Sequence, residues 1–536
     1  MPVNHLTLFK LARVSVFVPE DVEVVRARMI AEDNVVKKKA GRGTIRVALL
    51  YPSLPTVALD SLSYQMLYYW LNSLDDVYAE QFMLDFDGTP LTRSIETGTP
   101  LRDFDYVVIS VHYELDFVNI LRVLLEAGVE VYSERREKPV VIAGGPPVIA
   151  NPVPLSPFVD VLAVGEIEPL MPVLVDGMAG YRGDKRAFLE NLGAEKGFYV
   201  PLLHGGEEVV FNYARELSKE FSPSVQLQLL DPRAKWRRRT AVETSRGCFR
   251  MCAFCLEGHI FRGVRERPFE QVRRIVEEGS AGNRTRHVKL VSLSFFDHSE
   301  ADRILEWLVN EGYSFSIPSL RADTLNERRL EYIRLGGQKT LTVAPETLSP
   351  SLAIAIRKHI GYSLIRELSL SARKLGYTGL KVYLMVGIPG EREEDLRLTA
   401  EKLRQLASET GFKGERALKV TVSPLVPKPH TPLQYAPFVG IQEARRRIEI
   451  IRRELRGLAD VREYDPRLAY IQTIIARGDS MLSQVLLYWA LEGGGLGGWR
   501  KALRVTGVDV QRYLAPSPEE EPPWGFIRLP GVRGTR

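Results

Sequence analysis

The residues with the clearest chemical potential in this chain are its three cysteines. Cys248, Cys252 and Cys255 lie within one eight-residue loop of a 536-residue chain. Random placement would bring three cysteines this close together in roughly one of several thousand chains. Because their number is odd and the chain is long, a disulfide framework is excluded. We therefore expect the three thiols to hold a shared ligand.

The spacing C-x3-C-x2-C allows the loop to wrap one metal centre. Iron–sulfur cubanes usually take four cysteine ligands, and the chain has no fourth cysteine, so one iron would be open or held by another group. A structural zinc site of the Cys3His type is a second hypothesis, because His259 follows Cys255 by four residues. Three inert packed thiols are a third. The residues alone leave these alternatives open.

The cysteine loop follows TAVET, the first of six apolar runs that each precede a helical pattern. The other five are VKLVSLS, FSIPSL, KTLTVAP, GLKVYLMVG and ALKVTVSPL. Six consecutive strand–helix units predict a partial (β/α)6 barrel of the TIM type over residues 236–456. Chemistry in such barrels lies at the carboxyl ends of the strands, which is where the cysteine loop falls.

An earlier alternation of strands and helices predicts a doubly wound, Rossmann-like α/β domain over residues 44–177. Ligands of such sheets bind beyond the carboxyl ends of the strands. The residues expected at these strand ends are Ser110, Gly144, Gly145, Gly165 and Glu166. Tight turns at the strand exits explain the glycines equally well. No G-x-G-x-x-G follows the first strand in ALLYPSLPT, which argues against a dinucleotide there.

The remaining segments are expected to be smaller. Residues 1–43 form an N-terminal arm, 178–235 a connector, and 457–536 a mostly helical C-terminal extension. The connector ends in an arginine cluster over 233–239, which is typical of a solvated face or, less often, of a polyanion contact. No apolar run is long enough to span a membrane, and no signal-peptide pattern opens the chain. We therefore expect a cytoplasmic protein without a transmembrane segment.

Beyond these patterns, the loop ETSRGCFRMCAFCLEGH and the stretches SIPSLRAD, LTVAPETLSPSLAIAIRKHI, GLKVYLMVGIPGEREEDL and SPLVPKPHTPLQYAP resemble the radical S-adenosylmethionine (SAM) superfamily. AGGPPVIANPVPLSPFVDVLAVGEIEPLM resembles the Rossmann-like N-terminal domain of its B12-binding-type members. The resemblance covers about residues 44–495 and is closest to a largely uncharacterised subgroup with a C-terminal segment like IIARGDSMLSQVLLYWALEGG.

This resemblance implies that the three cysteines hold a [4Fe–4S] cluster whose open iron takes the amino and carboxylate groups of SAM. Reductive cleavage of SAM would then yield a 5'-deoxyadenosyl radical that abstracts hydrogen from a substrate. An external donor of the ferredoxin or flavodoxin type would supply the electron. The residues that the resemblance assigns to SAM are Phe254, Ser292, Ser294, Ser319, Arg321, Glu346, Gly387 and Val426. Ser292 and Ser294 depart from the superfamily's Gly-Gly-Glu pattern, while rim salt bridges and a plain turn remain alternatives for Arg321, Glu346 and Gly387.

Substrate and second cofactor stay open. Lys381 and Tyr383 share a strand face that could meet substrate. The Asp-x-His-x-x-Gly motif that binds cobalamin in related domains is absent. The resemblance leaves two alternatives, a domain that binds cobalamin without that motif and a vestigial or repurposed domain. No cysteines remain for a second cluster. The expected reaction is cobalamin-assisted methyl transfer or carbon–carbon bond formation. The candidate substrates are a lipid and an RNA base. The rivals are a nucleic-acid-binding or scaffold protein with structural zinc, and an enzyme whose Rossmann-like domain binds a nucleotide.

Overall fold

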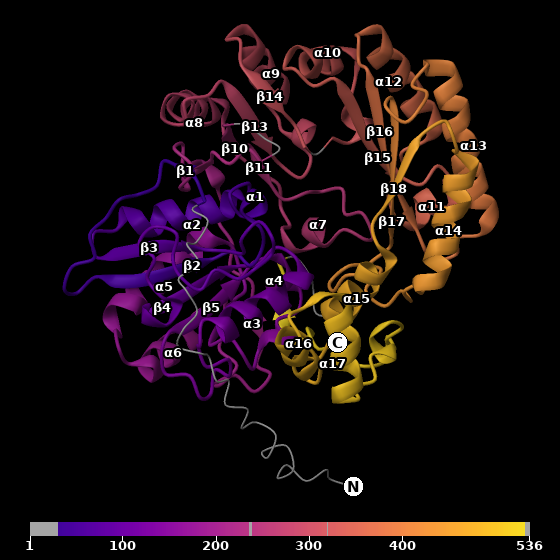
Figure 1. The fold of residues 1–536 in the computed structure, drawn as a ribbon. Helices are drawn as coiled ribbons and strands as arrows, with labels where there is room; N and C mark the ends of the chain where they lie inside the picture. Colours follow the sequence, from indigo (N-terminus) through magenta and orange to yellow (C-terminus); the bar gives the residue numbers. More distant parts are fainter. Residues whose placement is uncertain (1–29, 235–237, 319, 531–536) are drawn as a thin grey trace.

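The computed structural model describes residues 30–234, 238–318 and 320–530. Two parallel α/β units lie side by side, and the C-terminal helices α15 (Pro466–Arg477), α16 (Leu482–Leu491) and α17 (Gly495–Thr506) pack beside them (Figure 1). Of the arm expected over 1–43, residues 1–29 lie outside the described part. No helix in the described ranges is both long and apolar enough to cross a membrane.

The first unit is a six-stranded sheet in the order β3-β2-β4-β5-β6-β7. Its strands are β2 (Ile45–Leu50), β3 (Val77–Phe82), β4 (Tyr106–Ser110), β5 (Val140–Gly144), β6 (Val161–Ala163) and β7 (Phe198–Tyr199). All pairs are parallel except β6 with β7. The order reverses direction between β2 and β4, and ligands of doubly wound sheets bind at such a switch point.

Both faces of this sheet are covered because its strands are apolar on both sides. Helices α2 (Leu62–Ser73), α5 (Ile167–Gly180) and α6 (Lys185–Gly193) pack on one face. Helix α3 (Phe117–Glu126) packs on the other together with α16. The C-terminal extension therefore completes the core of the N-terminal unit. Residues 178–235, treated above as a connector, also contribute α6 and strand β7 to that unit.

The second unit is the partial barrel. One sheet contains β10 (Thr240–Glu243), β13 (His287–Val291) and β14 (Ser314–Ser316). The other contains β15 (Thr340–Glu346), β16 (Gly379–Val386), β17 (Leu418–Pro424) and β18 (Asp460–Glu463). The flanking helices are α8 (Phe269–Gly282), α9 (Ala301–Asn310), α10 (Glu327–Leu335), α11 (Pro350–Ala355), α12 (Tyr362–Lys374), α13 (Glu393–Thr410) and α14 (Ile441–Glu454).

These elements confirm the predicted fold class, a doubly wound domain followed by a six-unit partial barrel and a mostly helical end. At the barrel edge, strand β18 was not expected. β18 adds in parallel to β17 at the barrel edge, although its sequence DVRE is polar and leaves side chains half-buried or exposed. A polar four-residue strand at a sheet edge carries no apolar periodicity, so its pairing could not be predicted from the pattern.

Candidate functional site

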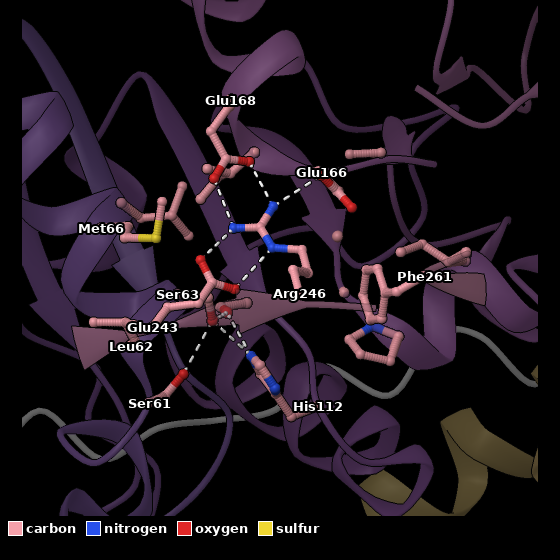
Figure 2. Close-up of a pocket in the computed structure, with 18 of the residues that line it drawn as sticks. Ser61, Leu62, Ser63, Met66, His112, Glu166, Glu168, Glu243, Arg246 and Phe261 are labelled. Atoms are coloured by element: carbon pink, nitrogen blue, oxygen red, sulfur yellow. Dashed lines mark hydrogen bonds and ion pairs between the residues drawn. The ribbon is translucent and has the colours of Figure 1, made fainter. Parts of the chain in front are cut away.

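A cavity of about 570 Å³ lies where the carboxyl edge of the N-terminal sheet meets the first two barrel strands (Figure 2). Its depth is apolar and runs beside the sheet, with Val108 and Ile142 on one side and Leu174 of α5 on the other. Its mouth is polar. All five residues predicted at the strand ends line it, namely Ser110, Gly144, Gly145, Gly165 and Glu166. The sequence reasoning thus located residues that the fold brings together.

The glycines of this edge are required by the chain itself. A Cβ on Gly145 would lie 1.9 Å from the carbonyl oxygen of Val111, and its φ of 125° disfavours other residues. A Cβ on Gly165 would lie 2.4 Å from the carbonyl oxygen of Asn212. Tight strand exits therefore explain these two glycines without a ligand. They nevertheless leave backbone surface open to the cavity.

A histidine and several hydroxyl groups stand at the switch point. The Nε2 atom of His112 lies 2.8 Å from the Oγ of Ser63 and 3.2 Å from the Oγ of Ser110, and its ring stacks on Tyr51. Burial among neighbouring atoms lowers the pKa of His112 to about 4, although part of its surface is exposed to the cavity. The imidazole is therefore neutral at neutral pH and able to accept or donate one hydrogen bond.

The mouth also contains a buried cluster of charges. Arg246 bridges three carboxylates, Glu166 and Glu168 from the N-terminal unit and Glu243 from β10, at 2.7–2.9 Å (Figure 2). Arg265 pairs with Glu166 as well, at 2.7 Å. Removing one partner from such a buried network leaves an uncompensated charge. The cluster therefore ties the two units together just before the cysteine loop.

The cysteine loop begins two residues after that arginine. Gly247 has φ 87°, and a Cβ there would meet the carbonyl oxygen of Gly263 at 2.5 Å, so only glycine fits this turn. Cys252 is buried, whereas Cys248 and Cys255 are partly exposed. Burial raises the pKa of Cys255 to about 11 and also raises the pKa of Cys248. Thiols in this environment become thiolates when a metal replaces the proton.

The structure gives two observations that concern the two metal hypotheses. A zinc ion needs all its ligands in one tetrahedral sphere, yet no three potential ligands converge in this way within the described ranges. The Nε2 atom of His259 instead contacts the carbonyl oxygen of Cys252 at 3.1 Å. A cubane cluster takes cysteine ligands on different irons, so it does not require the three thiols in one coordination sphere. The Cys3His hypothesis gains no support.

A second cavity of about 300 Å³ adjoins the cysteine loop. Two residues assigned to SAM, Phe254 and Val426, line it together with Cys255 and with Met385 at the end of β16. Three residues line both cavities, namely His112, Pro146 and Glu257. The cavity beside the sheet edge and the cavity beside the cysteines therefore meet at these side chains.

Two other residues assigned to SAM are engaged in ion pairs. Arg321 contacts Asp323 through two nitrogens and places Nη1 3.4 Å from the Sγ of Cys252. Glu346 accepts a hydrogen bond from Lys358 at 2.7 Å. Burial raises the pKa of Glu346, and the lysine opposes that effect. Both residues therefore form salt bridges, which was the alternative to a role in SAM binding. Arg321 also contacts the cysteine loop through Cys252.

The serines and the glycine assigned to SAM do not lie together in one cavity. Ser292 lines the first cavity, not the second, and its Oγ lies 2.7 Å from that of Ser245. Ser294 is buried and its backbone N–H donates to Ser292. Gly387 has φ 81° and its N–H donates to Glu391, so a strand-to-helix turn explains it. Ser319 lies outside the described residues.

Lys381 and Tyr383 do share one face of β16, as predicted, and the lysine donates to the tyrosine hydroxyl. Met385 lies on the same face, two residues further on, and reaches the second cavity. Neither Lys381 nor Tyr383 lines either cavity. Their role in substrate binding stays a prediction.

Sequence reasoning missed several residues of this region. His112 directly follows a predicted strand, and Glu257 follows Cys255 by two residues, so proximity to a strand end or to the cysteines could have identified both. Lys428 and Glu114 form an ion pair across the second cavity. That pair joins residues 314 positions apart, and no local pattern predicts it.

Comparisons with known proteins agree with this architecture. Residues 63–201 match the N-terminal region of radical SAM proteins, and residues 242–403 match the radical SAM superfamily. An uncharacterized protein of Methanocaldococcus jannaschii is 28% identical over 447 residues, which is 82% of this chain and 90% of the relative. Another, from Methanopyrus kandleri, is 23% identical over 441 residues, which is 71% and 79%.

One solved structure is similar over most of its length. The radical SAM methyltransferase TsrM from Kitasatospora setae, with cobalamin and a [4Fe–4S] cluster bound, matches with a TM-score of 0.53. The match covers 86% of this chain and all of that chain at 13% identity. At this identity the likeness is one of fold.

Proposed function

This chain belongs to the radical SAM superfamily with the B12-binding-type architecture, and on that premise we propose that it cleaves SAM reductively and abstracts hydrogen from a substrate. The observation that carries the proposal is the cysteine loop, which follows the first barrel strand and opens onto a cavity of about 300 Å³. We assign Cys248, Cys252 and Cys255 to a [4Fe–4S] cluster. That group, when bound, supplies the electron that breaks the sulfonium bond of SAM.

The chain's own residues would bind and orient SAM beside the loop. Phe254, Leu425 and Val426 line the same cavity as Cys255. The Arg321 guanidinium lies beside Cys252, with Nη1 3.4 Å from the Sγ atom. From the resemblance we also propose that Ser292, Ser294, Ser319, Glu346 and Gly387 contribute to the SAM site.

We further propose that the first cavity takes cobalamin and that the product is a methylated or carbon–carbon-bonded substrate. Support comes from the cavity's place at the topological switch point and from its content. The apolar depth would suit the flat apolar parts of the cofactor, and the polar mouth would suit the cofactor's amide side chains. The residues we assign to it are Ser110, Gly144, Gly145, Gly165 and Glu166. His112 also lines this cavity, although the chain lacks the Asp-x-His-x-x-Gly motif.

The arginine cluster over 233–239, which was the reason to consider an RNA substrate, is less available than the sequence suggested. Within the arginine cluster over 233–239, residues 235–237 are outside the described part. The described arginines pair with carboxylates of the chain, Arg233 with Asp231 and Arg238 with Asp33, and Arg239 pairs with Asp60. A lipid stays a candidate alongside RNA, and we propose a ferredoxin- or flavodoxin-type electron donor in the cytoplasm.

The test is anaerobic reconstitution with iron and sulfide, followed by SAM and dithionite and a chromatographic assay of 5'-deoxyadenosine. We expect the nucleoside from the wild type and none from Cys252→Ala. Ser517→Ala, a change in the C-terminal segment away from both cavities, is the matched control and should leave the yield unchanged. A protein that binds zinc and no iron under these conditions would overturn the proposal.

A further inference from the structure

The charges around the two cavities are almost completely compensated. Among described residues, those lining the cavities with a partner of opposite charge are Asp60, Glu114, Glu166, Glu168, Glu243, Arg246, Lys289 and Lys428. The remaining charged side chain is Glu257, which has neither an ion pair nor a side-chain hydrogen bond in the described part of the chain. One carboxylate is therefore left without a partner.

The position of Glu257 is as specific as its lack of a partner. It lies in the short helix α7 (Leu256–Ile260), which starts directly after Cys255. It lines both cavities, together with His112 and Pro146, and its side-chain surface is exposed to them. A molecule that reacts with groups in both cavities must pass this junction.

Within the described part of the chain, the cation that acts on this carboxylate is Lys428, and it does so without a direct ion pair. The Lys428 ammonium lines the same cavity, but it is held by Glu114, which also accepts a hydrogen bond from Gln472. His112 is the other polar side chain of the junction, and it is neutral because its pKa is near 4. A carboxylate that faces a cavity without an ion-pair partner is stabilised by a hydrogen-bonded cation.

We propose that Glu257 binds a cationic nitrogen of the substrate, a protonated amine or a guanidinium, at the junction of the two cavities. This inference rests on the proposed function, because it assumes that the substrate lies between them. The imidazole of His112, fixed by Ser63 and Ser110, offers a neutral hydrogen-bonding group beside the cation. An anionic substrate group would instead face an uncompensated carboxylate.

The experiment uses reconstituted protein with SAM but without reductant, so that no turnover occurs. Three probes share one ring and differ in charge, namely phenethylamine, 2-phenylethanol and phenylacetate. Their dissociation constants are measured by equilibrium dialysis. We expect the wild type to bind the amine at least about tenfold more tightly than the alcohol, as a charge-assisted hydrogen bond provides, and to bind phenylacetate most weakly.

Glu257→Gln should abolish this preference, whereas Glu278→Gln, an exposed glutamate on α8 that lines neither cavity, should keep it. Equal binding of the three probes, absent binding of the amine, or an amine preference that survives in Glu257→Gln would overturn the inference. A tenfold weaker affinity for SAM in Glu257→Gln would do so as well, because the carboxylate would then serve SAM. Failure of all variants, wild type included, to form 5'-deoxyadenosine would refute the proposed function instead.

Discussion

Replacing Arg321 by glutamine should lower the reduction potential of a cluster held by the cysteine loop. The guanidinium Nη1 atom lies 3.4 Å from the Sγ of Cys252 and donates toward it. Positive charge next to a cluster ligand stabilises the reduced form, which carries one more negative charge, and hydrogen bonds to the sulfurs act in the same direction. Removing the arginine therefore favours the oxidised form.

The size of the effect follows from the charges around Arg321. A full charge at 3.4 Å contributes about 5 kcal/mol at an effective dielectric constant of about 20. Asp323 accepts two hydrogen bonds from the same guanidinium and cancels most of that charge. We expect a remainder of about 1–2 kcal/mol, or about 40–90 mV for a one-electron couple.

The assay is a redox titration of the reconstituted protein followed by electron paramagnetic resonance. Arg250→Gln is the matched control, because the Arg250 guanidinium pairs with Asp323 and Asp297 and has no described contact with a cysteine sulfur, while its backbone N–H, which donates to Cys248, stays in place. Its potential should shift by less than half as much. An unchanged potential in Arg321→Gln, or the same shift in both variants, would refute the argument that the arginine acts through Cys252.

Three further outcomes follow from the described contacts. Asp160→Asn should destabilise the N-terminal unit by about 3–5 kcal/mol, because it leaves the fully buried Arg136 without its ion-pair partner; thermal unfolding monitored by circular dichroism measures this, and an unchanged midpoint would contradict it. Gly145→Ala should prevent soluble expression, since its Cβ would lie 1.9 Å from the Val111 carbonyl oxygen, and a normal yield would show that the turn can relax. Burial lowers the pKa of His430 to about 4, so the unfolded chain takes up its proton first and stability falls as pH drops from about 6.5 to 4. His430→Asn, which suits the φ of 59°, should reduce this pH dependence by about one proton in pH-dependent denaturant titrations, and an identical slope would refute it.

The sequence predicted the parts of this site that depend on strand ends. Apolar runs followed by helical patterns placed the cysteine loop after β10, and placed Ser110 and the glycines at one sheet edge, because parallel strands end on the same side. What could not be predicted were contacts across the chain. The Cys252–Arg321 contact joins loops that follow different strands. The Glu346–Lys358 pair depends on how the connection after β15 folds back on the strand end, and no periodicity encodes either contact.

Glycine roles show the same limit. Gly145 and Gly387 were expected because a cofactor needs close approach to backbone, with a tight turn as the alternative. The structure supplies a reason within the chain for each, the Val111 carbonyl for Gly145 and a φ of 81° with a hydrogen bond to Glu391 for Gly387. A sequence identifies that glycine is needed at a position, but the atom that excludes a side chain becomes visible only in three dimensions.

The arrangement of the two units explains how one substrate could meet groups from both cavities. The carboxyl edges of the two parallel sheets face each other across the first cavity, which is lined by residues following β4 and β5 and by residues of β10 and β13. The Arg246 cluster joins these edges with charges that are expensive to separate. His112, Pro146 and Glu257 then form a wall that the sheet-edge cavity shares with the cavity beside the cysteine loop. A reaction between groups on either side of that wall needs movement of side chains, and it does not need the two units to separate.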